Sequence, residues 1–367
     1  MSYGEGAELG FCEEAESWNL LSRYLPSKVG GKPSWLDLKN IPKSSDLKCL
    51  NCGKGLAFLL QLYAPVDDSN GEPVKATCYH RTVFVFCCKE CGKTFKTFRS
   101  QLPQRNEFYP PEDPEDRENW HPEIIVDKFT KVCSYCGCGS MSVCSKCKKR
   151  SYCGREHQIA DWSKHKKFCQ NTNGSQTKEE ESRNDFLFPE FKIVIEEETL
   201  GKVEKTVKCE LNRLNDLKKE GKAGIFADDP TVDAELNAIG TSEDKHFMKF
   251  KDLIKHNQDQ VIRYNKAKPL WVSDKNIPSE IDIAKCQYCD GKRTFEFQVM
   301  PQLLNSLNLD PLKDPLDWGT LAIFTCENNC DEGPNYKEEF IWKQDFGGCI
   351  KPEVTSRQQG NAQIVCS

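Results

Sequence analysis

The sequence contains no long hydrophobic run. No segment of the 367-residue chain reaches the roughly 18 consecutive apolar residues that a membrane-spanning helix requires, so we expect no membrane partner. The first residues, Met1 to Glu5, lack the basic stretch followed by an apolar stretch of a secretory signal. Residue 2 is not glycine and Cys366 is not the fourth residue from the end, so we expect no lipid anchor.

The sequence also lacks the common nucleotide-binding and catalytic motifs. It has no G-x-x-x-x-G-K-[ST] loop and no G-x-G-x-x-G after a strand pattern. The net charge of −5 and the isoelectric point of about 5.8 argue against a generally basic nucleic-acid binder, so direct nucleic-acid contact is not expected. The available Cys–His pairs are better placed as metal ligands, and a metal-bound thiolate is not a free nucleophile. We therefore expect no enzymatic activity.

Apolar residues are scarce, whereas cysteine is abundant. Hydrophobic residues make up 38% of the chain and the mean hydropathy is −0.65, which indicates a modest core. The chain has 21 cysteines, an odd number, and without an export signal it should occupy a reducing compartment where disulfides are rare. Many cysteines form C-x2-C or C-x3-C pairs, which is metal-ligand spacing. Zinc is therefore the leading candidate for the additional stabilisation of the fold.

The middle of the chain holds a dense cluster of Cys and His. Its eight candidate ligands suffice for two tetrahedral zinc sites, each with three Cys and one His, and closed sets of four describe structural sites. An interleaved arrangement predicts a cross-braced finger, although the spacing also permits sequential pairing. The interleaved sets are Cys133, Cys136, Cys153 and His157 for one ion, and Cys144, Cys147, His165 and Cys169 for the other.

The segments on either side of this cluster are copies of each other. The stretch Lys32–Trp35 matches Lys268–Trp271, and Val83–Phe86 matches Leu321–Phe324, at nearly constant offsets. Within each copy a C-x2-C pair precedes one strand pattern and a second Cys pair ends the next, as in a zinc ribbon. The predicted single-zinc sites are Cys49, Cys52, Cys88 and Cys91 in the first copy, and Cys286, Cys289, Cys326 and Cys330 in the second. Cys87 competes with Cys88, but the match of Phe86 with Phe324 favours Cys88.

These patterns predict a β-rich α+β fold. Duplicated zinc-ribbon-like β units form one lobe, and the cross-braced double-zinc finger is inserted between them. The predicted divisions are 1–110 and 246–349 for the two halves, 131–170 for the finger, 171–245 for a largely disordered acidic linker, and 350–367 for a disordered tail. We expect a helix over 243–264. Within the linker, the segment 186–195 is either an edge strand docked on the lobe, which we favour, or an exposed partner motif.

The finger is strongly basic in an acidic chain. Residues 131–170 contain nine Lys and Arg against two Asp and Glu, whereas 171–245 contain 11 against 18. The basic residues form either a solvated face or a contact surface for an acidic partner or RNA.

The central stretch resembles the MYND zinc finger. Tyr152-Cys153, His157-Gln158, Asp161-Trp162 and His165-x3-Cys169 fall where that family has them. Many members have cysteine at the position of His157, but imidazole also ligates zinc. The resemblance implies a protein-interaction module that binds short proline-containing peptides.

The whole chain resembles the programmed cell death protein 2 family. The matching stretches are Leu9-Gly10-Phe11, Pro26–Leu36, the finger, Phe186–Phe191 with Ile193–Ile195, and Glu296–Leu304. The resemblance implies a dedicated chaperone of a basic small-subunit ribosomal protein, the second in eukaryotic naming, that supports 40S ribosome biogenesis in cytoplasm and nucleus. The alternative is a nuclear MYND-type adaptor or corepressor scaffold in transcription or cell-death regulation.

Charge adds an expectation about where the client binds. Ribosomal proteins are strongly basic, so the acidic lobe rather than the basic finger should capture the client. We expect capture to involve Trp35, Trp271 and the strands Phe58–Tyr63 and Phe295–Met300, unless these aromatic residues serve only as core. The sequence assigns no role to Cys12, Cys78, Cys87, Cys138, Cys209, Cys349 or Cys366.

Overall fold

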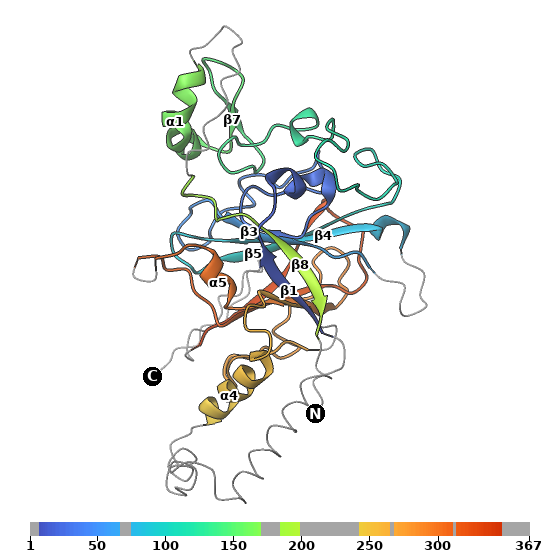
Figure 1. Cartoon of the computed structure of the whole chain (residues 1–367), viewed down its shortest axis with the longest axis vertical. Helices are drawn as coiled ribbons and strands as arrows, with labels where there is room; N and C mark the ends of the chain where they lie inside the picture. The colour runs from blue at the N-terminus through green and yellow to red at the C-terminus, as the bar shows by residue number, and fades with distance from the viewer. Residues whose placement is uncertain are drawn as a thin grey trace, which may run out of the picture.

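A ten-stranded antiparallel barrel forms the body of the protein (Figure 1). The computed structural model describes residues 7–66, 75–169, 184–198, 242–264, 268–310 and 313–346. Around the barrel the strands follow the order β1 (Glu8–Glu13), β8 (Phe191–Glu197), β2 (Lys28–Val29), β3 (Ala57–Tyr63), β4 (His80–Cys87), β5 (Phe95–Leu102), β12 (Tyr336–Gln344), β11 (Thr320–Cys326), β10 (Arg293–Val299) and β9 (Ile262–Tyr264). Strand β9 pairs with β1 and closes the barrel.

The remaining elements are short and lie outside the barrel wall. The finger contains the hairpin β6 (Ser142–Val143) and β7 (Ser151–Tyr152), followed by helix α1 (Arg155–Cys169). Helix α4 (Ser242–Ile254) lies at the opposite end of the molecule from the finger (Figure 1). The others are α5 (Leu303–Ser306) and the 3-10 turns Ser17–Leu20, Ser22–Tyr24, Ala76–Cys78 and Val126–Lys128. In the part of the chain that the structure describes, no helix has the length and apolar character needed to cross a membrane.

The two halves of the barrel repeat each other in detail. Strand β3 has a bulge between Phe58 and Leu60, and β10 has one at the matching place, between Phe295 and Phe297. Each long strand also carries a buried glutamine whose side-chain amide bonds the backbone beside the matched tryptophan. Gln61 bonds both N and O of Ser34, at 2.9 and 3.0 Å, and Gln298 bonds N and O of Leu270.

The halves join through two antiparallel seams. At one seam β5 pairs with β12. At the other, β1 pairs with β8 on one side and with β9 of the second copy on the other, while β8 pairs on its other side with β2 of the first copy. Strand β8, which lies between the copies in the sequence, is thus inserted between β1 and β2. The segment 186–195, expected to dock at an edge, instead supplies a strand inside the closed wall.

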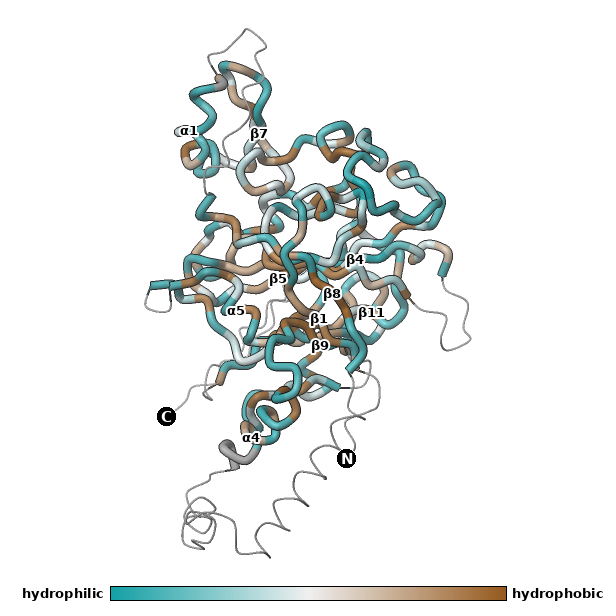
Figure 2. Tube along the Cα trace, in the orientation of Figure 1, coloured by the Kyte–Doolittle hydropathy of each residue, from teal (hydrophilic) through white to brown (hydrophobic). Residues whose placement is uncertain are grey.

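The barrel interior is apolar at one end and ionic at the other. Buried aliphatic and aromatic side chains from all around the wall, including Trp318 and Phe297, form one cluster. Figure 2 shows the hydrophobic residues that run along β1, β8 and β9. Toward the other end, Glu339 is fully buried between Arg99 and Arg293, with one carboxylate oxygen 2.8 Å from each Nε. Buried charges are tolerated only when paired in this way.

The helix expected over 243–264 is wrong in its second half. Helix α4 ends at Ile254, and Ile262–Tyr264 form strand β9. The polar stretch between them contains turns in which Asn257 N donates to Ile254 O. Val261 and Ile262 are buried because they face the barrel rather than a helical stripe. Most of the linker prediction and the tail prediction fall on residues outside the described ranges.

Candidate metal centres and the surfaces around them

Five tight turns of the same design present the cysteine pairs. In each, the residue four positions after the first Cys has a positive φ and donates its backbone N–H to the carbonyl of that Cys. A positive φ favours glycine, because other residues are strained there. The turns begin at Cys49, Cys88, Cys133, Cys144 and Cys286, and the positive-φ residues are Gly53, Gly92, Gly137, Lys148 and Asp290.

The structure brings each predicted quartet together. Within each set, all four candidate ligand atoms lie within 4.8 Å of one another. The sets are Cys49, Cys52, Cys88 and Cys91; Cys133, Cys136, Cys153 and His157; Cys144, Cys147, His165 and Cys169; and Cys286, Cys289, Cys326 and Cys330. The finger sets are therefore the interleaved ones, not the sequential ones. Cys87 is excluded from the first set because its side chain points into the barrel core, where burial raises the pKa of its thiol.

The dimensions of the quartets fit a tetrahedral zinc ion. Sulfur atoms about 2.3 Å from a tetrahedral centre lie about 3.8 Å apart. The observed separations are 3.4 Å for Cys49–Cys91, 3.6 Å for Cys286–Cys330 and 3.9 Å for Cys144–Cys169. Thiolate and imidazole donors in this geometry are the set that zinc prefers.

The two histidines face their quartets through different ring atoms. Nδ1 of His157 lies 3.0 Å from Cys153 Sγ, whereas Nε2 of His165 lies 3.3 Å from Cys144 Sγ. Backbone N–H groups around the sulfurs favour thiolates. A hydrogen bond from the Cys147 backbone is the main lowering influence on the pKa of Cys144, which falls to about 6, and one from Gly291 similarly lowers the pKa of Cys289 to about 7.

The second-half quartet is attached to the first half of the barrel. The Arg99 guanidinium on β5 is fully buried, and its Nη2 lies 3.5 Å from the carbonyl oxygen and 3.8 Å from Sγ of Cys330. Arg81 on β4 donates to the Asn329 side chain at 2.9 Å, and Gln101 donates to the Asn329 carbonyl at 3.0 Å. This part of the quartet therefore links the two copies. The sequence did not predict this role for Arg81, Arg99 and Gln101, because a single polar residue in a strand is usually expected to face solvent.

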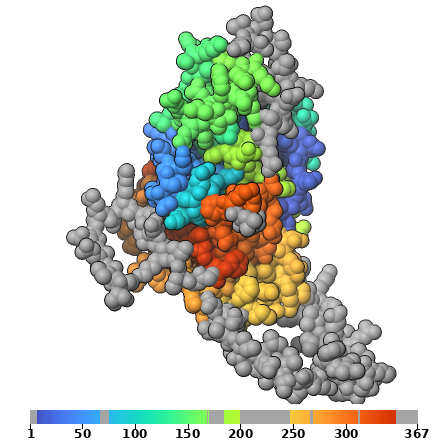
Figure 3. All heavy atoms as spheres, turned by 90° about the vertical axis from the view of Figure 1, so that its left-hand side faces the viewer, coloured from blue at the N-terminus to red at the C-terminus, as the bar shows by residue number. Residues whose placement is uncertain are grey.

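The finger packs on the first half of the barrel. The Trp35 indole Nε1 donates to the Gly137 carbonyl at 2.8 Å, and Lys32 Nζ donates to the Ser134 carbonyl at 2.7 Å. Cys133 and Tyr152 of the finger belong to one buried cluster with Trp35. In Figure 3 the finger lies against the N-terminal half and apart from α4. Trp35 is therefore core, contrary to the expectation that it contributes to client capture.

The strand Phe58–Tyr63 is likewise unavailable. Its residues are buried except for Tyr63, which is half-buried. Phe58 packs on Phe86 beneath the same cluster. The second-half strand Phe295–Met300 is also buried except for Phe295, so of the proposed capture elements in the second half only Trp271 and Phe295 are partly exposed.

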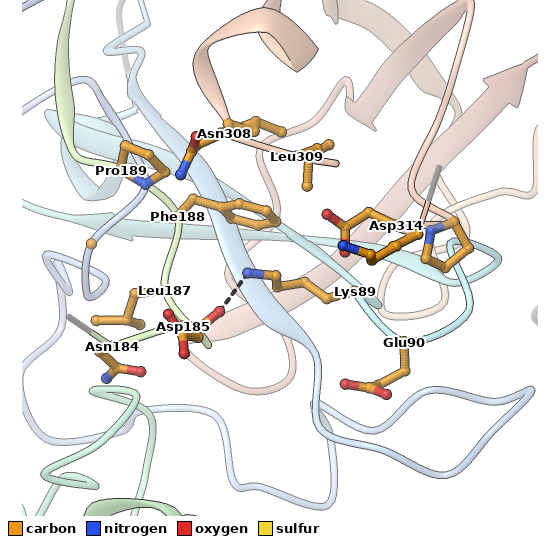
Figure 4. A pocket seen from close by; sticks show the side chains of 14 residues that line it. Lys89, Glu90, Asn184, Asp185, Leu187, Phe188, Pro189, Asn308, Leu309 and Asp314 are labelled. Atoms are coloured by element: carbon orange, nitrogen blue, oxygen red, sulfur yellow. Dashed lines mark hydrogen bonds between the residues drawn. The ribbon is translucent and has the colours of Figure 1, made fainter. Parts of the chain in front are cut away.

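A cavity of about 630 Å³ lies where the first quartet meets the segment before β8 and the loop after α5 (Figure 4). Lys89, between Cys88 and Cys91, donates to the Asp185 carbonyl at 2.7 Å and sits 4.5 Å from the centroid of the Phe188 ring. Phe188 is buried in the barrel cluster. These contacts attach the segment before β8 to the cysteine turn that begins at Cys88.

The cysteines outside the quartets are packing residues where the structure describes them. Cys78 and Cys138 are buried. Burial raises the pKa of the Cys12 thiol to about 11, although a hydrogen bond with Ser306 opposes this rise. Cys209, Cys349 and Cys366 lie outside the described residues.

Comparison with family models gives three matches. Residues 6–116 match "Programmed cell death protein 2, N-terminal domain", 244–345 match "Programmed cell death protein 2, C-terminal putative domain", and 133–169 match the MYND finger. No solved structure matches the chain significantly.

Curated relatives extend the similarity over most of the chain. Programmed cell death protein 2 of Mus musculus is 42% identical over 346 residues, which cover 92% of this chain and 96% of the relative. Programmed cell death protein 2-like of Mus musculus is 26% identical over 84% of this chain and 86% of its own length. A Schizosaccharomyces pombe protein named "Probable 20S rRNA accumulation protein 4" is 29% identical over 99 residues, about a quarter of each chain.

Proposed function

Since the chain belongs to the programmed cell death protein 2 family, we propose that it is a zinc-binding protein-interaction protein that acts as a dedicated chaperone of a basic small-subunit ribosomal protein. In this role it supports 40S ribosome biogenesis, in the cytoplasm and nucleus. The observation that carries the proposal is the similarity to a fission yeast protein named for 20S rRNA accumulation, within a family match that spans the chain. That name refers to ribosomal RNA in the fission yeast protein, and our proposal extends this connection to the present chain.

We assign one zinc ion to each of the four quartets, two in the finger and one in each half. Zinc supplies cross-links that a small apolar core lacks. Each quartet provides four protein donors and leaves no coordination position for a substrate, which is typical of structural sites. A binding role rather than catalysis follows from this proposal.

Charge supports a basic client. Without the finger, residues 1–130 carry a net −3 and residues 246–367 a net −2, while 171–245 carry −7. A basic protein that has not yet met its RNA is attracted to such a chain, and electrostatic steering accelerates its capture. The basic finger has the wrong sign for this task and should be dispensable for capture.

Co-expression tests the proposal. The full chain, tagged, is produced together with the small-subunit ribosomal protein that is second in eukaryotic naming, with an equally basic large-subunit ribosomal protein as the control. Soluble, stoichiometric recovery of the first but not the second is the expected result. Recovery of neither, or of both equally, would refute a dedicated chaperone.

The alternative, a nuclear MYND-type adaptor, has its own support in the finger. Met141, Val143, Ile159 and Trp162 are exposed large apolar side chains there. They fit the family expectation of a proline-containing peptide. Trp162→Ala separates the two functions, because it removes an exposed aromatic that is not itself a ligand, although its ring lies 5.8 Å from that of His165. Deletion of residues 131–170 would instead uncover Trp35. Loss of the client with Trp162→Ala would favour the adaptor surface.

A further inference from the structure

The two halves of the barrel present the same aromatic outer face, but only one of these faces is covered. In the first half, Trp35, Leu47 and Phe58 are at most 3% exposed. Their counterparts in the second half, Trp271, Ile283 and Phe295, are only partly buried around Phe324 and Trp342. Because of the duplication, the covered face of the first half shows how such an aromatic face is packed when another segment lies on it.

The first face is covered by segments of this chain that have little regular secondary structure. Residues 103–129 and the finger lie on it, and Phe108, Ile124 and Cys133 share its buried cluster. The Gly137 carbonyl accepts the hydrogen bond of the Trp35 indole. The face is thus suited to an extended, turn-rich chain that offers backbone carbonyls.

The second face has no such covering among the described residues. No described group accepts a hydrogen bond from the Trp271 indole, and Phe340 on β12 is only half-buried. The bordering loop 276–283 displays Ile281, which is 95% exposed, and Ile277, which is 41% exposed. Apolar side chains exposed to water beside an aromatic face do not stabilise a monomer, and such patches mark interaction sites.

We propose that this second-half face, defined by Trp271, Phe295, Phe340 and Ile281, is the surface that binds the client, and that it takes an extended basic and partly apolar segment. The inference rests on the proposed chaperone function. The acidic charge beside Ile281 favours a basic segment as the occupant of this face. Glu280 and Asp282 flank Ile281, both exposed, and neither has a Lys or Arg partner in the described part of the chain. A cationic segment complements this rim, whereas a second copy placing the same rim opposite would bring like charges together.

Site-specific photocrosslinking locates the contact. The substitution Ile281→p-benzoylphenylalanine places the probe on the proposed surface, and Ile159→p-benzoylphenylalanine, at a 63% exposed position on the finger, is the matched control. Both are made in the full chain co-expressed with the client. A client adduct from position 281 and none from position 159 is the expected result. An adduct to residues 347–367 of the same chain, or to a second copy, would overturn the proposal by showing another occupant.

Two surface substitutions measure the contribution without disturbing the fold. Ile281→Ala, which leaves the charge of the rim unchanged, should lower the client retained per chain about tenfold, as the loss of an apolar contact at an interface does. Glu280→Lys should slow capture and reduce its dependence on salt, and Glu112→Lys, at an exposed acidic position of the first half, should not.

The outcomes distinguish this surface from the function itself. If the wild-type chain retains no client, the chaperone function fails and this surface assignment fails with it. If the wild type retains the client and Ile281→Ala retains it equally, only the surface assignment is wrong. Loss with Trp162→Ala but not with Ile281→Ala would place binding on the finger.

Discussion

Removing the charge of Glu339 should destabilise the whole barrel. This carboxylate hydrogen-bonds both Arg99 on β5 and Arg293 on β10, and its own strand, β12, forms the seam with β5. Glu339→Gln keeps the shape of the side chain but removes the negative charge that the two buried guanidinium groups share. Because a buried charge cannot recover its hydration, the change affects both halves together.

The magnitude follows from the burial of the three side chains. They are 0–6% exposed, and breaking a buried pair of this kind costs about 3–5 kcal/mol. That is a large part of the stability of a typical domain, about 5–15 kcal/mol. The neighbouring Glu338 is the matched control, since it faces outward, is 36% exposed and lies 3.6 Å from Lys96. Its substitution to Gln should cost less than about 1 kcal/mol.

Urea unfolding of the full chain with zinc supplied, followed by far-UV circular dichroism, measures both variants. With an m value near 3 kcal/mol/M, the Glu339→Gln midpoint should fall by about 1 M or more. The Glu338→Gln midpoint should stay close to the wild type. Equal midpoints for the two variants would refute the view that the ionic end of the barrel holds the halves together.

Three other outcomes can be checked directly. Native mass spectrometry should find four zinc ions per chain, and chelation or acidification should unfold the protein because protons compete for the thiolates; two ions or fewer would remove the half-barrel sites. Gly137→Ala should lower the melting temperature of the protein more than Gly53→Ala does. Both glycines have a positive φ, but only at Gly137 would the new Cβ lie 2.8 Å from the side chain of Lys32. Equal decreases in melting temperature would mean that the contact between the finger and Lys32 can shift without cost. Co-expressed fragments 1–169 and 184–349 should associate. Omission of residues 184–198 should prevent this association, because β8 fills the gap between β1 and β2. Association of 1–110 with 246–349 alone would contradict the observed topology.

The local features of this fold could be predicted from the sequence. Fixed spacings place Cys133 and Cys136 in one turn, so the sequence predicted which neighbouring cysteines act as a pair. The spacing left open how these pairs combine into quartets, and the structure brings the interleaved sets together. The repeat likewise predicted the order of turn and strand in each half. The family resemblance, which rested on long motifs, is confirmed by the family models and the curated relatives.

The long-range features could not be predicted in this way. Nothing in the alternation of β5 or β12 indicates that these strands pair, and apolar residues near 261 fit a helix as well as a strand. The packing of the finger on Trp35 was equally hidden, because one indole N–H reaching one backbone carbonyl leaves no pattern in the sequence. Such contacts depend on where distant segments meet.

The pairing of β1 with β8 and β9 has a consequence for synthesis on the ribosome. Glu8 emerges first, yet its strand partners Glu197 and Tyr264 emerge long afterward. Contacts between such distant residues form slowly, and strand edges stay open until then. The finger, by contrast, closes within a short stretch of chain. A product truncated before Tyr336 leaves β5 without β12, so incomplete chains of this protein should themselves be substrates for cellular quality control rather than partly active fragments.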